Sequence, residues 1–395
     1  MHRSHSRKFA PSDHQGTFGR RLLLDGTWLF VVGMGLGDLA ARAAEPGNPS
    51  ELVQQLGSAT LRERDLAARR LVESGEAAMP ALEAGLKHSD AEVRARCRQI
   101  LSAVRSEAHQ RQLALFIADA EQKVTLPGWS QFRQMVGDDT AARGLFVDIQ
   151  RAEPELVREA ESQPKAASQQ LDRRCRELYQ EQYRASFGVR SQVSADSVAA
   201  LMFVSASDQV EPNETSLSAL QSFAFQQVFR HAVLSGPRKD ALKELLGQWL
   251  ERTAERADGG MHMRLALSYG VPQGLSIAKR LLKAKDVPAD QLPYALLAVG
   301  RLGTAEDAAV VEARLDDARP FQAVAVRGKA VATQVRDVAL AVLIHLNGEN
   351  LADYGLETVL KNSESLFTLS TIGFASDQSR EQAFERWKAR QSSAN

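Results

Sequence analysis

Residues 64–71 read RDLAARRL and residues 94–101 read RARCRQIL, so both segments share the spacing Arg-x-x-small-x-x-x-Leu. The shift from Arg64 to Arg94 is 30 residues. Apolar residues at this spacing form one face of a helix. A single helix pair cannot bury both of its apolar faces, so stable folds of this kind stack several pairs. The recurrence therefore predicts a protein built from repeated helical hairpins.

The segment between the two copies carries Ala78-x-Pro80-x-Leu82, followed by Asp90-x-x-Val93-Arg94. This order resembles the HEAT-like repeat family, in which a helix with a small-Pro-x-Leu motif precedes a helix with an Asp-x-x-Val-Arg motif. Residues 126–136, 334–346 and 353–355 also resemble segments of exported bacterial HEAT-repeat proteins that have no assigned function. The resemblance implies a helical solenoid and brings no activity with it.

The repeat pattern returns near the carboxyl end with a longer shift. Residues 297–302 match residues 341–346, a shift of 44 residues, which indicates an insertion between the matching helices. Residues 321–333 (FQAVAVRGKAVAT) alternate around the turn-like pair Arg327-Gly328. This alternation predicts a short β-hairpin inside one repeat, with an irregular loop as the alternative. An isolated hairpin is only marginally stable, so it should lean on the helices or on a partner.

We therefore expect an all-α fold, with a HEAT-like helical-hairpin solenoid in two segments around a less regular helical middle and one β-hairpin near 321–333. The expected parts, in chain order, are a leader (1–44), a linker (45–57), N-terminal HEAT-like repeats (58–122), an irregular helical middle (123–207), C-terminal HEAT-like repeats (208–350) and a C-terminal cap (351–395).

The amino terminus has the three parts of a signal peptide. A basic region of 26 residues precedes an apolar run at 27–37 (TWLFVVGMGLG), and Ala41-Arg42-Ala43 fits a small-x-small cleavage site. The run is shorter than the roughly 20 residues of a membrane-spanning helix. We expect cleavage and export to the periplasm or cell envelope. A retained anchor is the alternative, and contact with a membrane is expected only in that case.

The composition narrows the class of protein. Lys plus Arg equals Asp plus Glu, at 49 each, so the chain lacks the broad positive charge of a nucleic-acid-binding protein. The cysteines, Cys97 and Cys175, are too few for a disulfide framework and are expected in the core. Trp129, Trp249 and Trp387 fall on apolar helical faces and are expected there too. We expect no nucleic-acid partner and no cofactor.

Motifs that carry chemistry are weak in this sequence. There is no His-Glu-x-x-His motif and no Gly-x-Ser-x-Gly motif. His262 lies between two methionines, a set that suits copper, but a helix start with core methionines is the simpler interpretation. Ser162-x-x-Lys165 and Ser276-x-x-Lys279 lack the companion motifs of penicillin-binding enzymes. The carboxylate pairs at 138–139 and 316–317 are interpreted as a helix cap and a solvated helix end.

Arginines are the best candidates for contact with a ligand or partner. Arg64, Arg94 and Arg98 lie in the two copies of the repeat and could bind a phosphate or carboxylate. Tyr269, before a Gly-Val-Pro break, and Arg327, in the expected hairpin turn, are further candidates. The structural alternative is that these repeat arginines pair with acidic residues of the neighbouring helices. The acidic residues available are Glu63, Asp65, Glu73 and Asp90.

Together these features predict a non-catalytic interaction scaffold outside the cytoplasm, which binds a peptide, a protein or an envelope component on a solenoid groove. The alternative is a HEAT-like enzyme or ligand carrier of the lyase type, with its site in the groove. A cleft with strongly shifted titratable groups would favour that alternative.

Overall fold

The computed structural model describes residues 47–185, 193–326 and 329–394. The chain forms two compact units, which divide between Ile100 and Leu101. The described residues are predominantly helical and include two small two-stranded sheets, so the predicted helical class is confirmed. None of the helices in these ranges is long and apolar enough to cross a membrane. The predicted leader lies outside the described residues.

The first unit is made of short helices. They are α1 (Pro49–Gln55), α2 (Leu61–Glu73), the 3-10 helix η1 (Gly75–Ala78), α3 (Met79–Gly85) and the beginning of α4 (Ala91–Ala118). Helix α1 lies within the segment expected to be a linker. Asn48 caps it, accepting a hydrogen bond from the Ser50 N–H, and Pro49 occupies its first turn. Because Leu52 and Val53 of this helix are buried, the segment belongs to the unit.

Helices α3 and α4 pack very closely in the first unit. A Cβ atom added at Gly85 would lie 2.5 Å from the Sγ atom of Cys97 and 3.0 Å from a methyl group of Val53. Cys97 is fully buried, as predicted. The small side chains at 85 and 97 therefore let the two helices approach each other.

The second unit contains the remaining elements. Its first half holds the rest of α4, α5 (Trp129–Val136), α6 (Thr140–Ala152), α7 (Pro154–Ser162), α8 (Pro164–Ala185), α9 (Ala195–Ser205), α10 (Glu214–Ala224), α11 (Gln227–Ser235) and α12 (Lys239–Thr253). Its second half holds α13 (Gly259–Tyr269), α14 (Gln273–Lys283), α15 (Leu292–Leu302), η2 (Ala305–Asp307), α16 (Ala308–Glu312), β1 (Pro320–Val326), β2 (Lys329–Gln334), α17 (Val335–Leu346), η3 (Leu351–Tyr354), β3 (Lys361–Asn362), β4 (Leu366–Phe367), η4 (Leu369–Thr371) and α18 (Asp377–Ala394). Asp139 caps α6 by accepting a hydrogen bond from the Ala142 N–H, as predicted.

The core of the second unit is continuous from α4 to α18. An aromatic cluster fills its first half, where the Phe116 ring meets the Trp129 ring edge-on at 5.0 Å between centroids. Trp249 and Trp387 are also buried, and so is Cys175. The prediction that these tryptophans and this cysteine belong to the core is confirmed.

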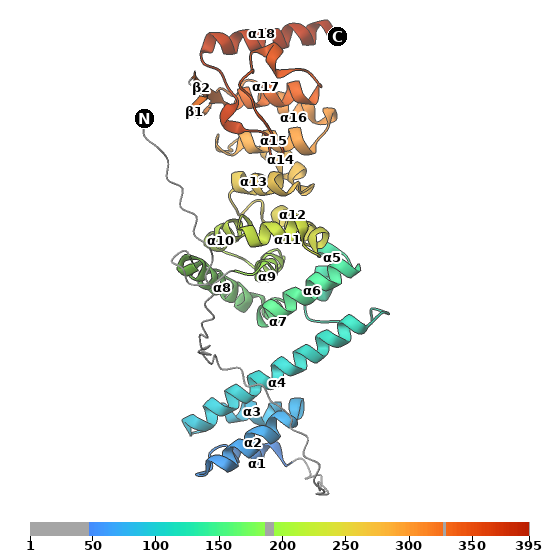
Figure 1. Cartoon of the computed structure of the whole chain (residues 1–395), viewed down its shortest axis with the longest axis vertical. Coiled ribbons are helices and arrows are strands. Elements are labelled where there is room, and N and C mark those ends of the chain that lie inside the picture. Colours follow the sequence, from blue (N-terminus) through green and yellow to red (C-terminus); the bar gives the residue numbers. More distant parts are fainter. Residues whose placement is uncertain (1–46, 186–192, 327–328, 395) are drawn as a thin grey trace, which may run out of the picture. The chain divides into compact units, whose positions relative to one another are not determined.

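The predicted β-hairpin is confirmed as well. Strands β1 and β2 pair antiparallel, with Ala323 opposite Ala332, and the hairpin lies beside α17 (Figure 1). Its second strand also pairs with the loop before α18, because Ala332 and Phe374 exchange two backbone hydrogen bonds of 3.0 and 3.1 Å. Gly373 allows this approach with a φ of 135°, since an added Cβ would lie 2.5 Å from the Ala332 carbonyl oxygen. The hairpin is therefore held by contacts with other elements of the second unit.

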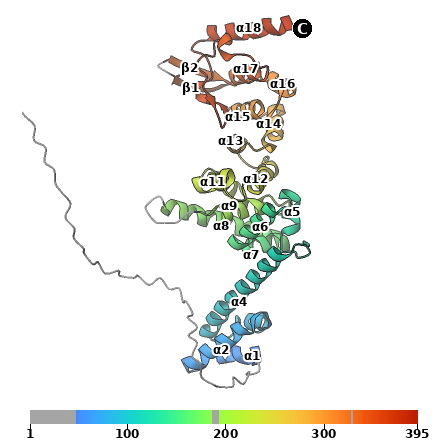
Figure 2. The ribbon, with the colours of Figure 1, turned by 45° about the vertical axis from the view of Figure 1, so that its right-hand side comes forward.

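A buried ion pair joins α18 to α17, which lie beside each other in Figures 1 and 2. The Nε atom of Arg380 donates to Asp337 at 2.9 Å, and the two side chains are 3% and 0% exposed. Arg380 also donates to the Ala332 carbonyl oxygen at 3.0 Å, and Asp337 accepts from the Gln334 N–H at 2.8 Å. Every charged group of the pair is thus bound by further polar groups, as a buried pair requires.

Candidate functional site

The repeat arginines of the first unit bind backbone carbonyl groups. The Nη1 atom of Arg64 donates to the Ser58 carbonyl oxygen at 3.1 Å. Thirty residues later in the repeat, Arg94 donates to the carbonyl oxygens of His88 and Ser89 at 2.7 and 2.6 Å. Both arginines reach back six residues to the loop before their own helix. Each guanidinium therefore fixes the turn between two helices.

Among the described residues, an ion pair between the two copies of the repeat belongs to Arg96, a neighbour of Arg94 on the same helix. Arg96 pairs with Asp65 at 3.4 Å across the two repeats, and with Glu92 of its own helix at 2.7 Å. Arg98 is exposed and makes no hydrogen bond or ion pair with any residue that the structure describes. Arg64 and Arg94 bind main-chain oxygens in place of the acidic side chains that were the structural alternative.

Tyr269 and Arg327 are the other two residues predicted to contact a ligand or partner. Tyr269 is 3% exposed and its hydroxyl donates to the Ala224 carbonyl oxygen. Burial raises its pKa to about 12, so it is a neutral core residue and not the edge of a groove. Arg327 lies outside the described residues. Arg64 and Arg94 thus fix turns within the first unit, and Tyr269 belongs to the core of the second unit.

His262 is also a core residue. Its ring is buried between the Gln221 amide, 2.7 Å from Nδ1, and the Thr253 hydroxyl, 2.9 Å from Nε2. The Thr253 hydroxyl donates its hydrogen to the Trp249 carbonyl oxygen, so it accepts from the imidazole. Burial lowers the pKa of His262 to about 4. No group of three or more His, Cys, Asp or Glu side chains in the described ranges is arranged to hold a metal ion.

A groove between α14 and the η2–α16 segment is the best candidate site. It encloses about 750 Å³, which falls in the range of ligand pockets. Val310 supplies apolar surface, and Ala309 and Ala313 leave room along α16 and at its end. Charged side chains border this apolar surface. They are Lys279, Lys283, Lys285, Glu306, Asp307 and Arg314.

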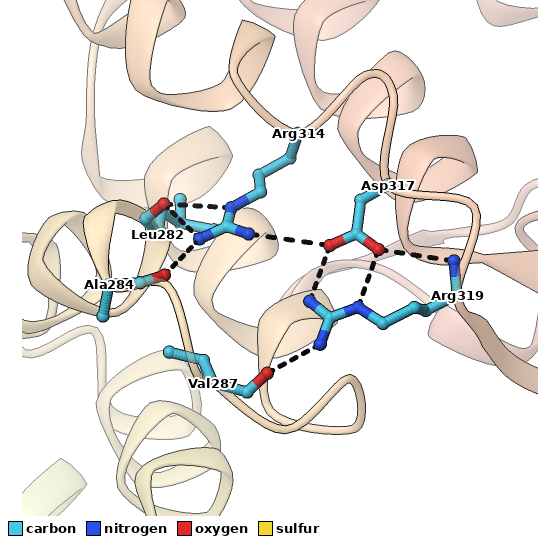
Figure 3. Close-up of polar contacts among 6 residues, drawn as sticks. All are labelled: Leu282, Ala284, Val287, Arg314, Asp317 and Arg319. Carbon is cyan, nitrogen blue, oxygen red and sulfur yellow. Dashed lines mark hydrogen bonds and ion pairs between the residues drawn. The ribbon is translucent and has the colours of Figure 1, made fainter.

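Arg314 fixes one end of the groove (Figure 3). Its Nε and Nη2 atoms donate to the Leu282 carbonyl oxygen at 2.9 and 2.6 Å, and Nη2 also donates to the Ala284 carbonyl oxygen at 2.7 Å. These carbonyl groups belong to the end of α14, where helices leave acceptors without partners inside the helix. The guanidinium satisfies these acceptors and adds a positive charge where the helix dipole favours one.

Asp317 joins Arg314 to a second arginine. It accepts two hydrogen bonds from the Arg319 guanidinium, at 2.8 and 2.7 Å, and lies 3.6 Å from Arg314. The hydrogen bonds from Arg319 hold the pKa of Asp317 below its usual value. Arg319 also donates to the Val287 carbonyl oxygen at 2.9 Å. The side chain of Asp317 is 11% exposed, so the interpretation of 316–317 as a solvated helix end is wrong for this residue.

Lys279 crosses the groove to pair with Asp307. The hydrogen bond from Lys279 holds the pKa of Asp307 below its usual value, and Asp307 also accepts from the Thr304 N–H at 2.9 Å. The hydroxyl of Ser276 donates to Glu251 at 2.6 Å. Ser276 and Lys279 thus have separate partners.

Lys283 and Lys285 remain available for binding. Both are exposed, and neither forms an ion pair with any part of the chain that the structure describes. Arg314 and Lys279, by contrast, are already engaged. The groove therefore offers two free ammonium groups beside apolar surface, an arrangement that suits a ligand carrying carboxylates and apolar side chains.

The sequence contained a signal for this groove. Residues 279–285 read KRLLKAK, four basic residues among seven, at the end of an amphipathic helix. The equal totals of acidic and basic residues over the whole chain do not show this local excess. The carbonyl contacts of Arg314 and Arg319 had no such signal, because main-chain acceptors leave no mark in the sequence.

Comparison with protein-family models gives no match, and a search of curated proteins finds no relative either.

Proposed function

We propose that this chain is a non-catalytic interaction scaffold outside the cytoplasm, and that the α14–α16 groove binds an acidic, partly apolar segment of a partner protein. The observation that carries the proposal is the pair of exposed lysines, Lys283 and Lys285, that have no ionic partner and border apolar surface. Charges placed around an apolar contact set the specificity and the rate of association.

We further propose that the helices stack as a HEAT-like solenoid in two segments around a less regular middle. The support is the contact made by Arg64 and again by Arg94, which places the same guanidinium at the same turn of consecutive helix pairs. Stacked pairs share their apolar faces, so a fixed turn geometry keeps successive pairs in register. A solenoid also presents long surfaces suited to extended partners.

The groove is tested with a fluorescent peptide of alternating Glu and Leu residues and the double variant Lys283→Glu/Lys285→Glu. We expect the peptide to bind the wild-type protein, more weakly as salt rises, and the variant to bind at least about tenfold more weakly. Fluorescence anisotropy measures both. Lys165→Glu, which reverses an exposed lysine on α8, is the matched control and should bind as the wild type does. Equal affinity of all three proteins would rule the groove out.

The location is tested by sequencing the amino terminus of the protein isolated from its native cell envelope. We expect the mature chain to begin just after Ala43, because Ala41-Arg42-Ala43 fits the cleavage pattern. An intact amino terminus in the envelope fraction would instead favour a retained anchor, and recovery in the cytoplasm would contradict export.

A further inference from the structure

A second cavity lies between α8 and α10, and the α14–α16 groove shares none of its residues. It encloses about 560 Å³. Residues one helical turn apart on each helix border it, so two parallel stripes face a common space. From α8 come Arg176, Tyr179 and Gln180, and from α10 come Thr215, Ser218 and Ser222.

The base of this cavity is held rigidly. Asp172 accepts a hydrogen bond of 2.6 Å from the Ser216 hydroxyl and one of 3.4 Å from the Asn213 N–H. One turn away on α8, the Ser168 hydroxyl accepts from the Glu211 N–H at 3.0 Å. Cys175 contributes a buried thiol, whose pKa burial raises to about 12. The base is thus uncharged apart from Asp172, and contacts between the helices hold that carboxylate in place.

At the rim of the cavity, unlike at its base, the polar side chains make no hydrogen bonds to described residues. The hydroxyl groups of Thr215, Ser218 and Ser222 make no hydrogen bond with any described residue, and the same holds for the side chains of Tyr179 and Gln180. All five side chains are exposed, Tyr179 by 55%. The cavity is therefore lined by several unpaired donors and acceptors together with one exposed aromatic ring.

We propose that the α8–α10 cavity binds a neutral saccharide. The C–H face of a sugar ring packs against an aromatic ring, while its hydroxyl groups need donors and acceptors around the edge. Tyr179 supplies the ring, and Gln180 with the α10 hydroxyls supplies the edge. Arg176 and Asp172 carry opposite charges, so the lining has no net charge to favour an anion or a cation. The volume falls in the range of sites that enclose a small ligand.

The test is isothermal titration calorimetry of the full chain with a panel of neutral disaccharides, namely maltose, cellobiose and the disaccharide of N-acetylglucosamine. We expect saturable binding of at least one, with a Kd of about 1 mM or tighter. Tyr179→Ala should weaken binding at least about tenfold, because it removes the stacking surface, whereas Tyr179→Phe should retain it because the ring remains.

Tyr183→Ala is the matched control, since Tyr183 is an exposed tyrosine on the same helix that does not line the cavity. It should bind the sugar within about twofold of the wild type. Circular dichroism shows whether each variant is folded. The proposal is overturned if no disaccharide binds the folded wild-type protein, or if Tyr179→Ala binds as tightly as Tyr183→Ala. Binding of the acidic peptide at the α14–α16 groove is measured independently, so either result can fail alone.

Discussion

The first unit and the second unit use the same arginine contact in different surroundings. In the first unit, Arg94 donates to the His88 and Ser89 carbonyl oxygens, and the contact is local, because His88 precedes Arg94 by only six positions. In the second unit, Arg314 donates to the Leu282 carbonyl oxygen, 32 residues away. The Asp317 carboxylate forms an ion pair with the same guanidinium. In the first unit the contact fixes a turn before the arginine's own helix, whereas in the second unit it joins the segment after α16 to the end of α14.

This difference indicates which polar contacts contribute most to the free energy of unfolding. A local contact forms at a small cost in chain entropy and adds little, because the turn is already restricted. A contact between distant segments joins elements that otherwise separate on unfolding. We therefore expect the polar contacts of the second unit to be the more costly to remove.

The largest effect is expected for Arg380→Ala in the second unit. The substitution leaves the fully buried Asp337 without its cation, and breaking such a pair costs about 3–5 kcal/mol of unfolding free energy. Urea unfolding followed by tryptophan fluorescence measures it, since all three tryptophans of the described ranges lie in this unit. Arg173→Ala, at an exposed arginine of α8, serves as the control and should cost under about 0.5 kcal/mol. Equal midpoints for the two variants would break the comparison.

His262 is expected to make the second unit sensitive to acid. Its pKa is lowered to about 4 in the folded state, from 6.5, so the unfolded chain binds a proton first as the pH falls. The contribution of neutral His262 is therefore complete above pH 6.5 and decreases by about 3 kcal/mol between pH 6.5 and 4.

Unfolding free energies across this pH range, compared with those of His262→Gln, isolate the effect of the imidazole. The wild-type slope should exceed that of the variant, which lacks the titrating ring. Parallel slopes would show that His262 is already accessible to protons in the folded unit.

The smallest effects compare the two arginine contacts directly. Arg314→Ala leaves the carbonyl groups of Leu282 and Ala284 without their charged donor and should cost about 2 kcal/mol. Arg94→Ala should cost about 1 kcal/mol, because water reaches the exposed turn at Ser89. Hydrogen exchange of the amides near each turn reports the two units separately. A larger loss of protection for Arg94→Ala would reverse the comparison.

The sequence predicted the parts of the fold that depend on periodicity. The helical class and the hairpin followed from spacing, because repeats of 3.6 and 2 residues are visible along the chain. Helix α1 was missed because Pro49 and its Pro-Gly-Asn context indicate a break, although proline is well tolerated in a first helical turn. Tyr269 was placed at an edge for a similar reason. The Gly-Val-Pro break after it ends α13, but the ring itself faces the core.

The candidate site was harder to predict than the fold. A groove depends on which side chains remain unpaired after folding, and the sequence does not show that Lys279 is engaged while Lys283 is free. The prediction of the five contact residues rests on their chemical type. Type alone does not separate an arginine that binds a ligand from one that fixes a turn.

The arginine contacts also affect which amino-acid substitutions the loops of this chain can accept. Arg64, Arg94 and Arg314 each bind main-chain oxygens, and every residue type carries one. The arginine contacts themselves therefore set no requirement on the side chains of the residues that supply these oxygens, provided that the loop keeps its length and path. Divergent members of such a lineage should therefore keep the arginines and the loop lengths while the loop residues vary. A comparison that weights the spacing between arginines will then detect kinship that residue identity conceals.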